Sequence, residues 1–251
     1  MPHVYYGDPS QEFSLELLKA LASGGGDLLE VGIPFSDPVA DGGTFQRVCW
    51  RALEGGVTPL LCLDGVRKLR GMGVINPIVL TTYYNIPYVF GLERFMEAVS
   101  GAGVQGLIVP DMPVEESCTL IDKGSRHGID VILQVAPTTS DERLKRIVDV
   151  ASGFIYVINV EGVTGSREAV LESTLRLVKR VRQVTDLPVL AGFGVSTGEH
   201  ARALMEAGAD GVVAGSVYAG IYESRIDAPM EALPLIMEKA QELKDGCSLD
   251  Y

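Results

Sequence analysis

The feature that most constrains the fold of this chain is a regular alternation of short β-branched runs with helix-length amphipathic segments. Eight runs are expected to be strands, at residues 3–6, 27–32, 76–82, 104–109, 129–134, 153–158, 187–191 and 210–214. Each is followed by a segment expected to be a helix, at residues 11–23, 58–72, 92–101, 114–126, 140–151, 167–185, 197–207 and 229–245. This order in 251 residues predicts a (β/α)8 barrel, as a single domain over residues 1–251.

Two segments depart from the repeat. The connection over residues 33–57 is much longer than an ordinary strand-to-helix loop, and it contains a helix-like piece over residues 44–53. Long connections of this kind are usually functional. The first expected strand begins almost at Met1, so we expect no segment before it to plug the barrel floor.

Composition excludes several classes of function. The net charge of −12 argues against a nucleic-acid partner. No apolar run approaches the roughly 18 to 20 residues that span a bilayer, and the first residues lack a signal-peptide pattern, so a cytoplasmic location is expected. The four cysteines are far apart in sequence, which predicts free thiols rather than a metal or redox motif.

The carboxyl ends of the expected strands lack lysines and clustered histidines. This narrows the set of candidate catalytic groups, because barrel active sites lie at these strand ends. All seven lysines fall in predicted helices, so none is placed to form a Schiff base. His3 begins the first strand, His127 precedes the fifth and His200 lies in a helix, so we expect no histidine cluster at the mouth and no metal site. Acid–base chemistry is therefore expected to fall on carboxylates.

Glu30, at the end of the second strand, is the leading candidate. Burial of a carboxyl group among apolar residues favours its protonated form, which suits proton transfer. The alternative is an acid that caps a backbone group or pairs with an arginine. Asp41, on the loop beyond, is a second candidate. Its alternative role is that of an acid at the N-terminus of the helix near Thr44. A magnesium site formed by Asp37 and Asp41 is disfavoured, because such sites usually use several carboxylates and substrate phosphates as ligands.

Glycines after the last two strands predict a phosphate site. Gly192-Phe193-Gly194 follows the seventh strand, and Gly215-Ser216 follows the eighth and opens a short helix-like segment. Bare backbone N–H groups at a helix N-terminus bind anions, and barrels bind phosphate at this place. The alternative is that these glycines only make turns. The segment 162–165 is a candidate lid. The residues thus predict a metal-free barrel enzyme that uses carboxylates on a phosphorylated small molecule.

These residues also carry a family resemblance. The stretch Leu29-Glu30-Val31-Gly32-Ile33-Pro34-Phe35-Ser36-Asp37-Pro38-Val39-Ala40-Asp41-Gly42 resembles the signature of the α subunit of tryptophan synthase. Further matches run in order along the chain: Gly7-Asp8-Pro9, Asp111-Met112-Pro113-Val114-Glu115-Glu116-Ser117, Gly162-Val163-Thr164-Gly165, Gly192-Phe193-Gly194 and Gly215-Ser216. The resemblance therefore covers nearly the whole chain. It also implies that the family's usual helix before the first strand is absent here.

The resemblance implies a reaction and a role for each residue. The family cleaves indole-3-glycerol phosphate to indole and glyceraldehyde 3-phosphate by a retro-aldol reaction without a cofactor. Glu30 takes the acid–base role by its place in the motif, and Asp41 accepts a hydrogen bond from the indole N–H. The implied substrate-binding residues are Tyr83, Tyr156, Thr164, Gly165, Phe193, Gly194, Gly215 and Ser216.

The resemblance also implies a partner, a β subunit that carries pyridoxal phosphate and forms an α2β2 heterotetramer with this chain. Pro34, Asp37 and Pro38 are the implied contacts. Two alternatives stay open. One is another phosphate-binding barrel, such as a sugar-phosphate isomerase or indoleglycerol-phosphate synthase, although the synthase needs a strand-end lysine. The other is a non-catalytic barrel that only activates a β subunit.

Overall fold

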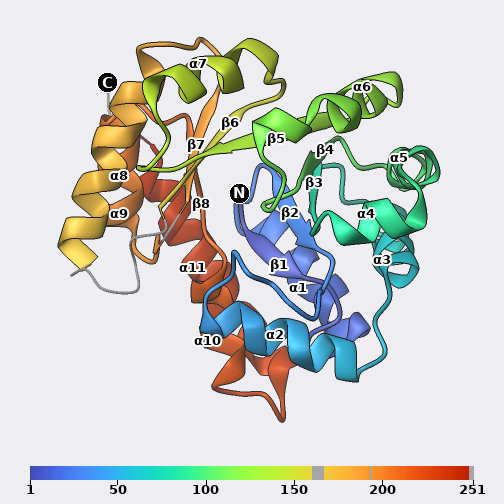
Figure 1. Ribbon diagram of the computed structural model, residues 1–251. Helices are drawn as coiled ribbons and strands as arrows, with labels where there is room; N and C mark the ends of the chain where they lie inside the picture. The colour runs from blue at the N-terminus through green and yellow to red at the C-terminus, as the bar shows by residue number, and fades with distance from the viewer. Residues whose placement is uncertain (160–166, 193, 249–251) are drawn as a thin grey trace.

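A computed structural model describes residues 1–159, 167–192 and 194–248 of the protein. Its centre is one eight-stranded parallel sheet in the order β1 to β8 (Figure 1). The strands are β1 (His3–Tyr5), β2 (Leu29–Gly32), β3 (Ile78–Thr81), β4 (Gly106–Ile108), β5 (Asp130–Val135), β6 (Ile155–Ile158), β7 (Val189–Gly192) and β8 (Gly211–Val213). Every expected strand is present.

The sheet closes on itself between its last and first strands. Pro2 forms a parallel bridge with Ala214, and the backbone N–H of His3 donates to the Ala214 carbonyl at 2.8 Å. The N–H of Ala214 donates in turn to the Met1 carbonyl at 3.1 Å. These bonds complete the (β/α)8 barrel that the alternation of segments predicts.

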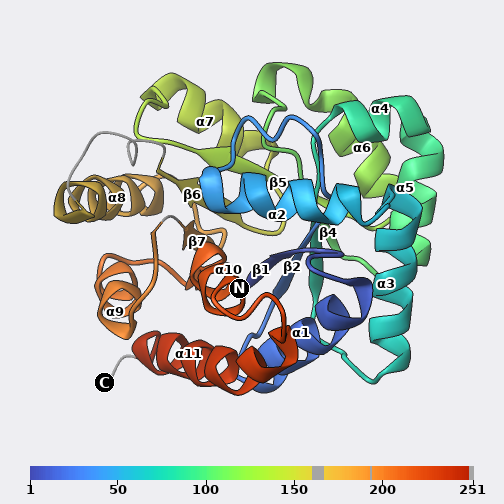
Figure 2. The same cartoon turned by 90° about the horizontal axis from the view of Figure 1, so that it is seen from below.

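Helices form a ring around the strands, as Figure 2 shows. Those of the regular repeat are α1 (Gln11–Ser23), α3 (Pro59–Gly71), α5 (Leu92–Gly101), α6 (Cys118–Arg126), α7 (Asp141–Val150), α8 (Arg167–Arg182), α9 (Gly198–Glu206) and α11 (Leu233–Gly246). Short 3-10 turns, η1 (Val114–Glu116) and η3 (Pro229–Ala232), precede α6 and α11. No helix within the described residues combines the length and the apolar composition that crossing a bilayer requires.

Three more helices lie at the strand ends. The long connection after β2 contains α2 (Gly43–Glu54), and Ser216 begins α10 (Ser216–Glu223), as the sequence predicts. The third, α4 (Asn85–Phe90), was not expected, because Pro87 and its β-branched and aromatic neighbours disfavour a helix. Pro87 lies within the first turn, where a missing N–H is tolerated, and Gly91 at φ +89° ends the helix.

The barrel interior changes character along its axis. Its lower part is an apolar cluster of Val79, Ile108, Ile132 and Phe154, separate from the larger core between strands and helices. Above this cluster the inward positions carry polar side chains, among them Glu30. The apolar layer supports the fold, so the polar residues above it are available for chemistry.

Candidate active site

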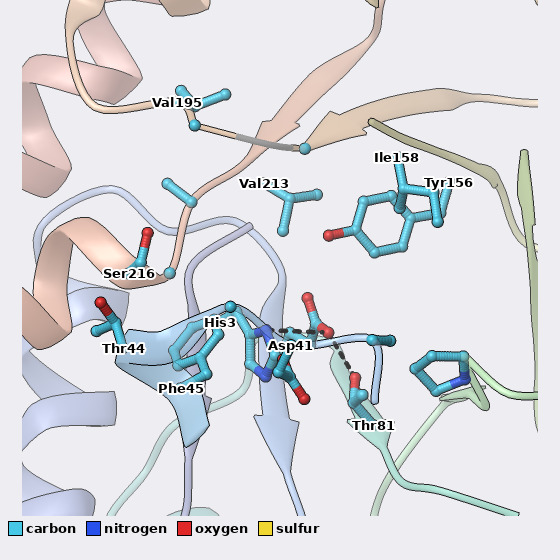
Figure 3. Close-up of a pocket in the computed structure, with 18 of the residues that line it drawn as sticks. His3, Asp41, Thr44, Phe45, Thr81, Tyr156, Ile158, Val195, Val213 and Ser216 are labelled. Carbon is cyan, nitrogen blue, oxygen red and sulfur yellow. Dashed lines mark hydrogen bonds and ion pairs between the residues drawn. The ribbon is translucent and has the colours of Figure 1, made fainter. Parts of the chain in front are cut away.

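A cavity of about 480 Å³ opens at the carboxyl ends of the strands. Its walls come from β1, β2, β3, β5, β6, β7 and β8, from the loop after β2, and from the first residues of α2 and α10. Figure 3 shows aromatic and hydroxyl side chains converging on this space from opposite walls. None of the described lining residues is a lysine or an arginine. This is the place at which the sequence predicts the active site.

Glu30 lies on the cavity wall and is 1% exposed. Its Oε1 atom accepts a hydrogen bond from Thr81 Oγ1 at 2.5 Å and lies 3.4 Å from His3 Nδ1; dashed lines in Figure 3 mark both contacts. The other oxygen, Oε2, is buried and has no hydrogen-bond partner among the described residues. Burying a carboxyl oxygen without a hydrogen-bond partner lowers the stability of the fold. Such an atom in a cavity wall is therefore a candidate for contact with a substrate. No arginine pairs with Glu30 in the described structure, contrary to the structural alternative.

Asp41 is held in a similar way. Its Oδ2 atom accepts hydrogen bonds from Tyr5 Oη at 2.6 Å and from Tyr83 Oη at 2.7 Å. Burial, followed by the charge of Asp41, raises the pKa of both phenols, so both remain protonated donors. The Asp41 Oδ1 atom accepts no hydrogen bond from the described residues. Asp41 also lines the cavity, so one oxygen of each carboxyl group is left for a substrate.

Tyr156, on β6, lines the cavity opposite β1. Burial raises the pKa of its phenol well above the ordinary value, and the charges of Glu30 and Asp41 raise it further. Gly192 makes room for it, because a Cβ atom there would lie 2.8 Å from the Tyr156 hydroxyl oxygen. Tyr83 differs from expectation in its position: its side chain is buried against Asp41 and the Ala40 N–H, and it does not line the cavity.

The predicted phosphate residues lie at the opposite end of the cavity. Gly194, Gly215 and Ser216 all line it, and Ser216 is the first residue of α10. Gly194 has φ +65°, a conformation that favours glycine. The Gly215 backbone lies so close to Phe45 that a Cβ atom would be 2.5 Å from Phe45 Cζ. Thr164, Gly165 and Phe193 lie outside the described residues.

The three predicted partner contacts are placed differently from one another. Pro34 and Pro38 are buried within the chain, whereas Asp37 is exposed. Beside them, Val39 is 80% exposed. On the adjoining α4, Tyr88 and Val89 are 68% and 75% exposed. The rim of the cavity therefore carries apolar side chains in contact with solvent.

Sequence reasoning missed three residues that contact the carboxyl groups: His3, Tyr5 and Thr81. His3 was set aside because it begins a strand, yet it pairs in register with Glu30 on the neighbouring strand. The available signal was the spacing of two residues that separates His3 from Tyr5 and Thr81 from Tyr83. Alternate residues of a strand face the same side, so His3 and Tyr5 point into the barrel together, whereas Tyr83 lies beyond the end of β3.

Comparisons with known proteins agree with the barrel fold. The family model described as "Tryptophan synthase alpha chain" matches residues 1–248. The alpha chain of Methanosarcina acetivorans is 45% identical over 97% of this chain and 86% of its own length, and that of Picosynechococcus sp. is 43% identical over 98% and 92%. A chain from the tryptophan synthase α2β2 complex of Pyrococcus furiosus superposes with a TM-score of 0.90 and 37% identity, covering 96% of each chain.

Proposed function

Because the chain belongs to the tryptophan synthase alpha chain family, we propose that the cavity at the mouth of its barrel is the active site. The enzyme is a lyase that cleaves indole-3-glycerol phosphate to indole and glyceraldehyde 3-phosphate. The observation that carries the site assignment is the state of Glu30, which lines the cavity with Oε2 buried and unpaired.

Glu30 moves the protons of this retro-aldol reaction. Its protonated form delivers a proton to indole C3, which leaves a positive charge on the ring. The resulting carboxylate then removes the proton from the hydroxyl group on the carbon bonded to C3. The C–C bond breaks, its electron pair restores the ring double bond, and the hydroxyl oxygen becomes the aldehyde oxygen. Glu30 ends the cycle protonated, so one group serves as acid and as base.

Asp41 stabilises the charge that develops on the ring. Its Oδ1 atom accepts the hydrogen bond of the indole N–H, while Tyr5 and Tyr83 hold Oδ2. A fixed negative charge near the indolium nitrogen favours the charged intermediate over neutral substrate. Tyr156 lies across the cavity from β1, where its phenol contacts the indole or the glycerol hydroxyl groups.

The phosphate group binds at Gly194, Gly215 and Ser216. No cationic side chain lines this end within the described residues, so backbone N–H groups and the positive N-terminus of α10 provide the attraction. Phe193, Thr164 and Gly165 belong to the same proposal by their place in the sequence motifs. This arrangement puts phosphate at β7 and β8 and the indole near β2.

The partner in this proposal is a β subunit in an α2β2 heterotetramer, the assembly named for the Pyrococcus furiosus relative. Asp37 and Val39, together with Tyr88 and Val89 of α4, offer the exposed contacts, and Pro34 and Pro38 stiffen the loop beneath. Pyridoxal phosphate belongs to that partner, because the cleavage here requires only proton transfers. A biosynthetic lyase of this kind acts in the cytoplasm, which we propose as its location.

Indole release from indole-3-glycerol phosphate tests the proposal, with and without a tryptophan synthase β subunit. We expect Glu30→Gln to lose at least about a hundredfold in kcat, the scale of general acid–base catalysis. Glu12→Gln on α1 is the matched control and retains activity. Wild-type protein that releases no indole even with the β subunit would support the non-catalytic alternative, and an active Glu30→Gln would remove Glu30 from the mechanism.

A further inference from the structure

The carboxyl groups of Glu30 and Asp41 are held by neighbouring side chains in the same way. In each, one oxygen is held by side chains of the strands or strand ends that flank β2, and the other is left without a partner in the described structure. His3 and Thr81 contact Glu30 Oε1, whereas Tyr5 and Tyr83 donate to Asp41 Oδ2. The contacts from β1 come from His3 and Tyr5, two residues apart on one face of a three-residue strand.

We propose that β1 is a positioning strand, in which His3 orients Glu30 and Tyr5 orients Asp41 so that each presents one chosen oxygen to the substrate. The proposal rests on the function assigned above to the two acids. His3 and Tyr5 are positioning residues rather than catalytic residues, because they act through carboxyl groups. Thr81 completes the contact with Glu30 from β3.

Local packing fixes the His3 ring in the orientation that this role requires. Its ring centroid lies 4.9 Å from that of Tyr5 and 4.7 Å from that of Phe45, and the Tyr5 and Phe45 centroids are 5.3 Å apart. These rings form a three-membered cluster between β1 and α2. Packing against these rings restricts rotation of the imidazole. In this orientation the His3 Nδ1 atom faces Glu30.

Simple core filling does not explain a histidine at this position. The His3 side chain is buried, and its Nε2 atom has no hydrogen-bond partner in the part of the chain that the structure describes. An apolar residue of similar size fills the same space without leaving a polar atom unpaired, so the histidine carries a cost for folding. Its contact with Glu30 Oε1 is the interaction that an apolar residue lacks.

The neighbouring Tyr6 provides a matched control. It follows Tyr5 in sequence, is equally buried, and packs against Gly65 of α3 on the outer side of the barrel. Its hydroxyl group is buried and has no hydrogen-bond partner within residues 1–159, 167–192 and 194–248. Tyr5→Phe and Tyr6→Phe therefore delete the same atom one residue apart, and only the first deletion removes a contact with Asp41.

The test is the kinetics of indole release for His3→Phe, Thr81→Val, Tyr5→Phe and Tyr6→Phe, with glycerol 3-phosphate binding as the check that each site is folded. We expect His3→Phe and Thr81→Val to lower kcat by roughly tenfold to a hundredfold with KM nearly unchanged, since misplacement of a catalytic group has this effect. Tyr5→Phe should lower kcat/KM, and Tyr6→Phe should match the wild type.

A rescue experiment separates positioning from packing. Asparagine carries an N–H donor near the place of His3 Nδ1, whereas glutamine carries it farther along the side chain. His3→Asn should therefore recover most of the kcat lost in His3→Phe, and His3→Gln should not. Thr81→Val, which removes a donor to the same Glu30 oxygen, decides the question if the His3 variants fail to fold.

The outcomes separate this proposal from the function on which it rests. Inactive Glu30→Gln together with wild-type kcat in His3→Phe and Thr81→Val would overturn the positioning role and leave the mechanism intact. Fully active Glu30→Gln would overturn the mechanism and the positioning role together. Equal losses in Tyr5→Phe and Tyr6→Phe would assign the effect of Tyr5 to packing and contradict the proposal.

Discussion

At the scale of single residues, the site depends on a few close approaches between backbone and side chain. Gly215 illustrates this, because its backbone leaves the space that Phe45 and His3 occupy. A Cβ atom at this position would meet both side chains, so glycine provides the room that they need. The same residue therefore lies at the proposed phosphate site and takes part in the packing around Glu30.

Gly215→Ala should weaken phosphate binding and reduce stability. The new Cβ atom would lie 2.5 Å from Phe45 Cζ and 3.1 Å from His3 Cβ, so the aromatic ring must move. Overpacking of this kind costs about 1–3 kcal/mol of the free energy of unfolding. Gly220→Ala, within α10 and with no described atom near its Cβ position, is the control and should be neutral or stabilising. Urea denaturation and glycerol 3-phosphate titration measure both effects, and equal behaviour of the two variants would contradict this explanation.

Site residues that belong to a local sequence pattern are predictable, whereas contacts between residues far apart in sequence are not. Glu30 and the residues at Gly194, Gly215 and Ser216 stand out because strand ends and glycine turns are local patterns. The contacts of His3 with Glu30 and of Tyr5 with Asp41 join residues 27 and 36 positions apart; the first depends on the register of β1 and β2, and the second on the path of the loop after β2. A register is set only when the whole sheet assembles, so single-sequence patterns do not reveal it.

At the scale of elements, α2 and α10 are joined by a charged network beside the cavity. Arg51 of α2 binds the buried Asp8 carboxylate through two hydrogen bonds of 2.6 and 2.7 Å. Tyr222 of α10 donates to Asp8 at 2.6 Å, and Glu223 accepts from Arg51 and Arg47 at 2.8 Å each. The network thereby fixes the helix after the Asp41 loop against the helix that begins at the proposed phosphate site.

Asp8→Asn should lower the free energy of unfolding by about 3 kcal/mol, because it leaves a partly buried arginine with half of its partners. Asp64→Asn is the control: its pair with Arg67 is exposed on α3, so its loss should cost less than about 1 kcal/mol. Urea denaturation of both variants gives the comparison. A loss for Asp8→Asn as small as that of Asp64→Asn would show that the network does not stabilise the fold.

The rim of the cavity should bind the β subunit through apolar contacts. Val39→Glu places a charge on a side chain that is 80% exposed beside α4, and it should weaken the α–β complex by about tenfold in Kd. Ile75→Glu changes a residue that is 91% exposed just before β3, at the opposite end of the barrel, and should leave the affinity unchanged. Isothermal titration with the β subunit measures both. Equal affinities would place the interface elsewhere.

Elements differ in how well sequence predicts them. The strands and the outer helices follow hydrophobic periodicity, and all of them are confirmed. The short helix α4 is not predicted, because tertiary contacts override the propensities of its residues. The N–H of Tyr84, just before the helix, donates to Asp111 in the loop after β4. The position of α4 therefore depends on its contacts with the assembled barrel.

At the scale of the whole molecule, burial of tyrosine links stability to alkaline pH. Six of the nine tyrosines have a raised pKa, with burial as the largest cause, and the Tyr6 value is about 12. The unfolded chain ionises these phenols near the ordinary value of 10.0, before the folded chain does. Their contribution to stability is therefore fully present below pH about 10 and is lost as pH rises further.

An ultraviolet titration checks this linkage. We expect most phenolate absorbance to appear in one cooperative step that coincides with the loss of circular dichroism, because the buried phenols ionise as the protein unfolds. A gradual rise in phenolate absorbance with unchanged circular dichroism would contradict the burial described here.

The central claim is that one cavity holds the phosphate of indole-3-glycerol phosphate at β7 and β8 while Glu30 faces indole C3. A crystal structure of Glu30→Gln with this substrate bound tests it most directly. We predict phosphate density on the backbone of Gly194, Gly215 and Ser216, the indole N–H on Asp41, and residue 30 within hydrogen-bond reach of the glycerol hydroxyl beside C3. Phosphate density away from these glycines, or an indole ring remote from residue 30, would contradict the account.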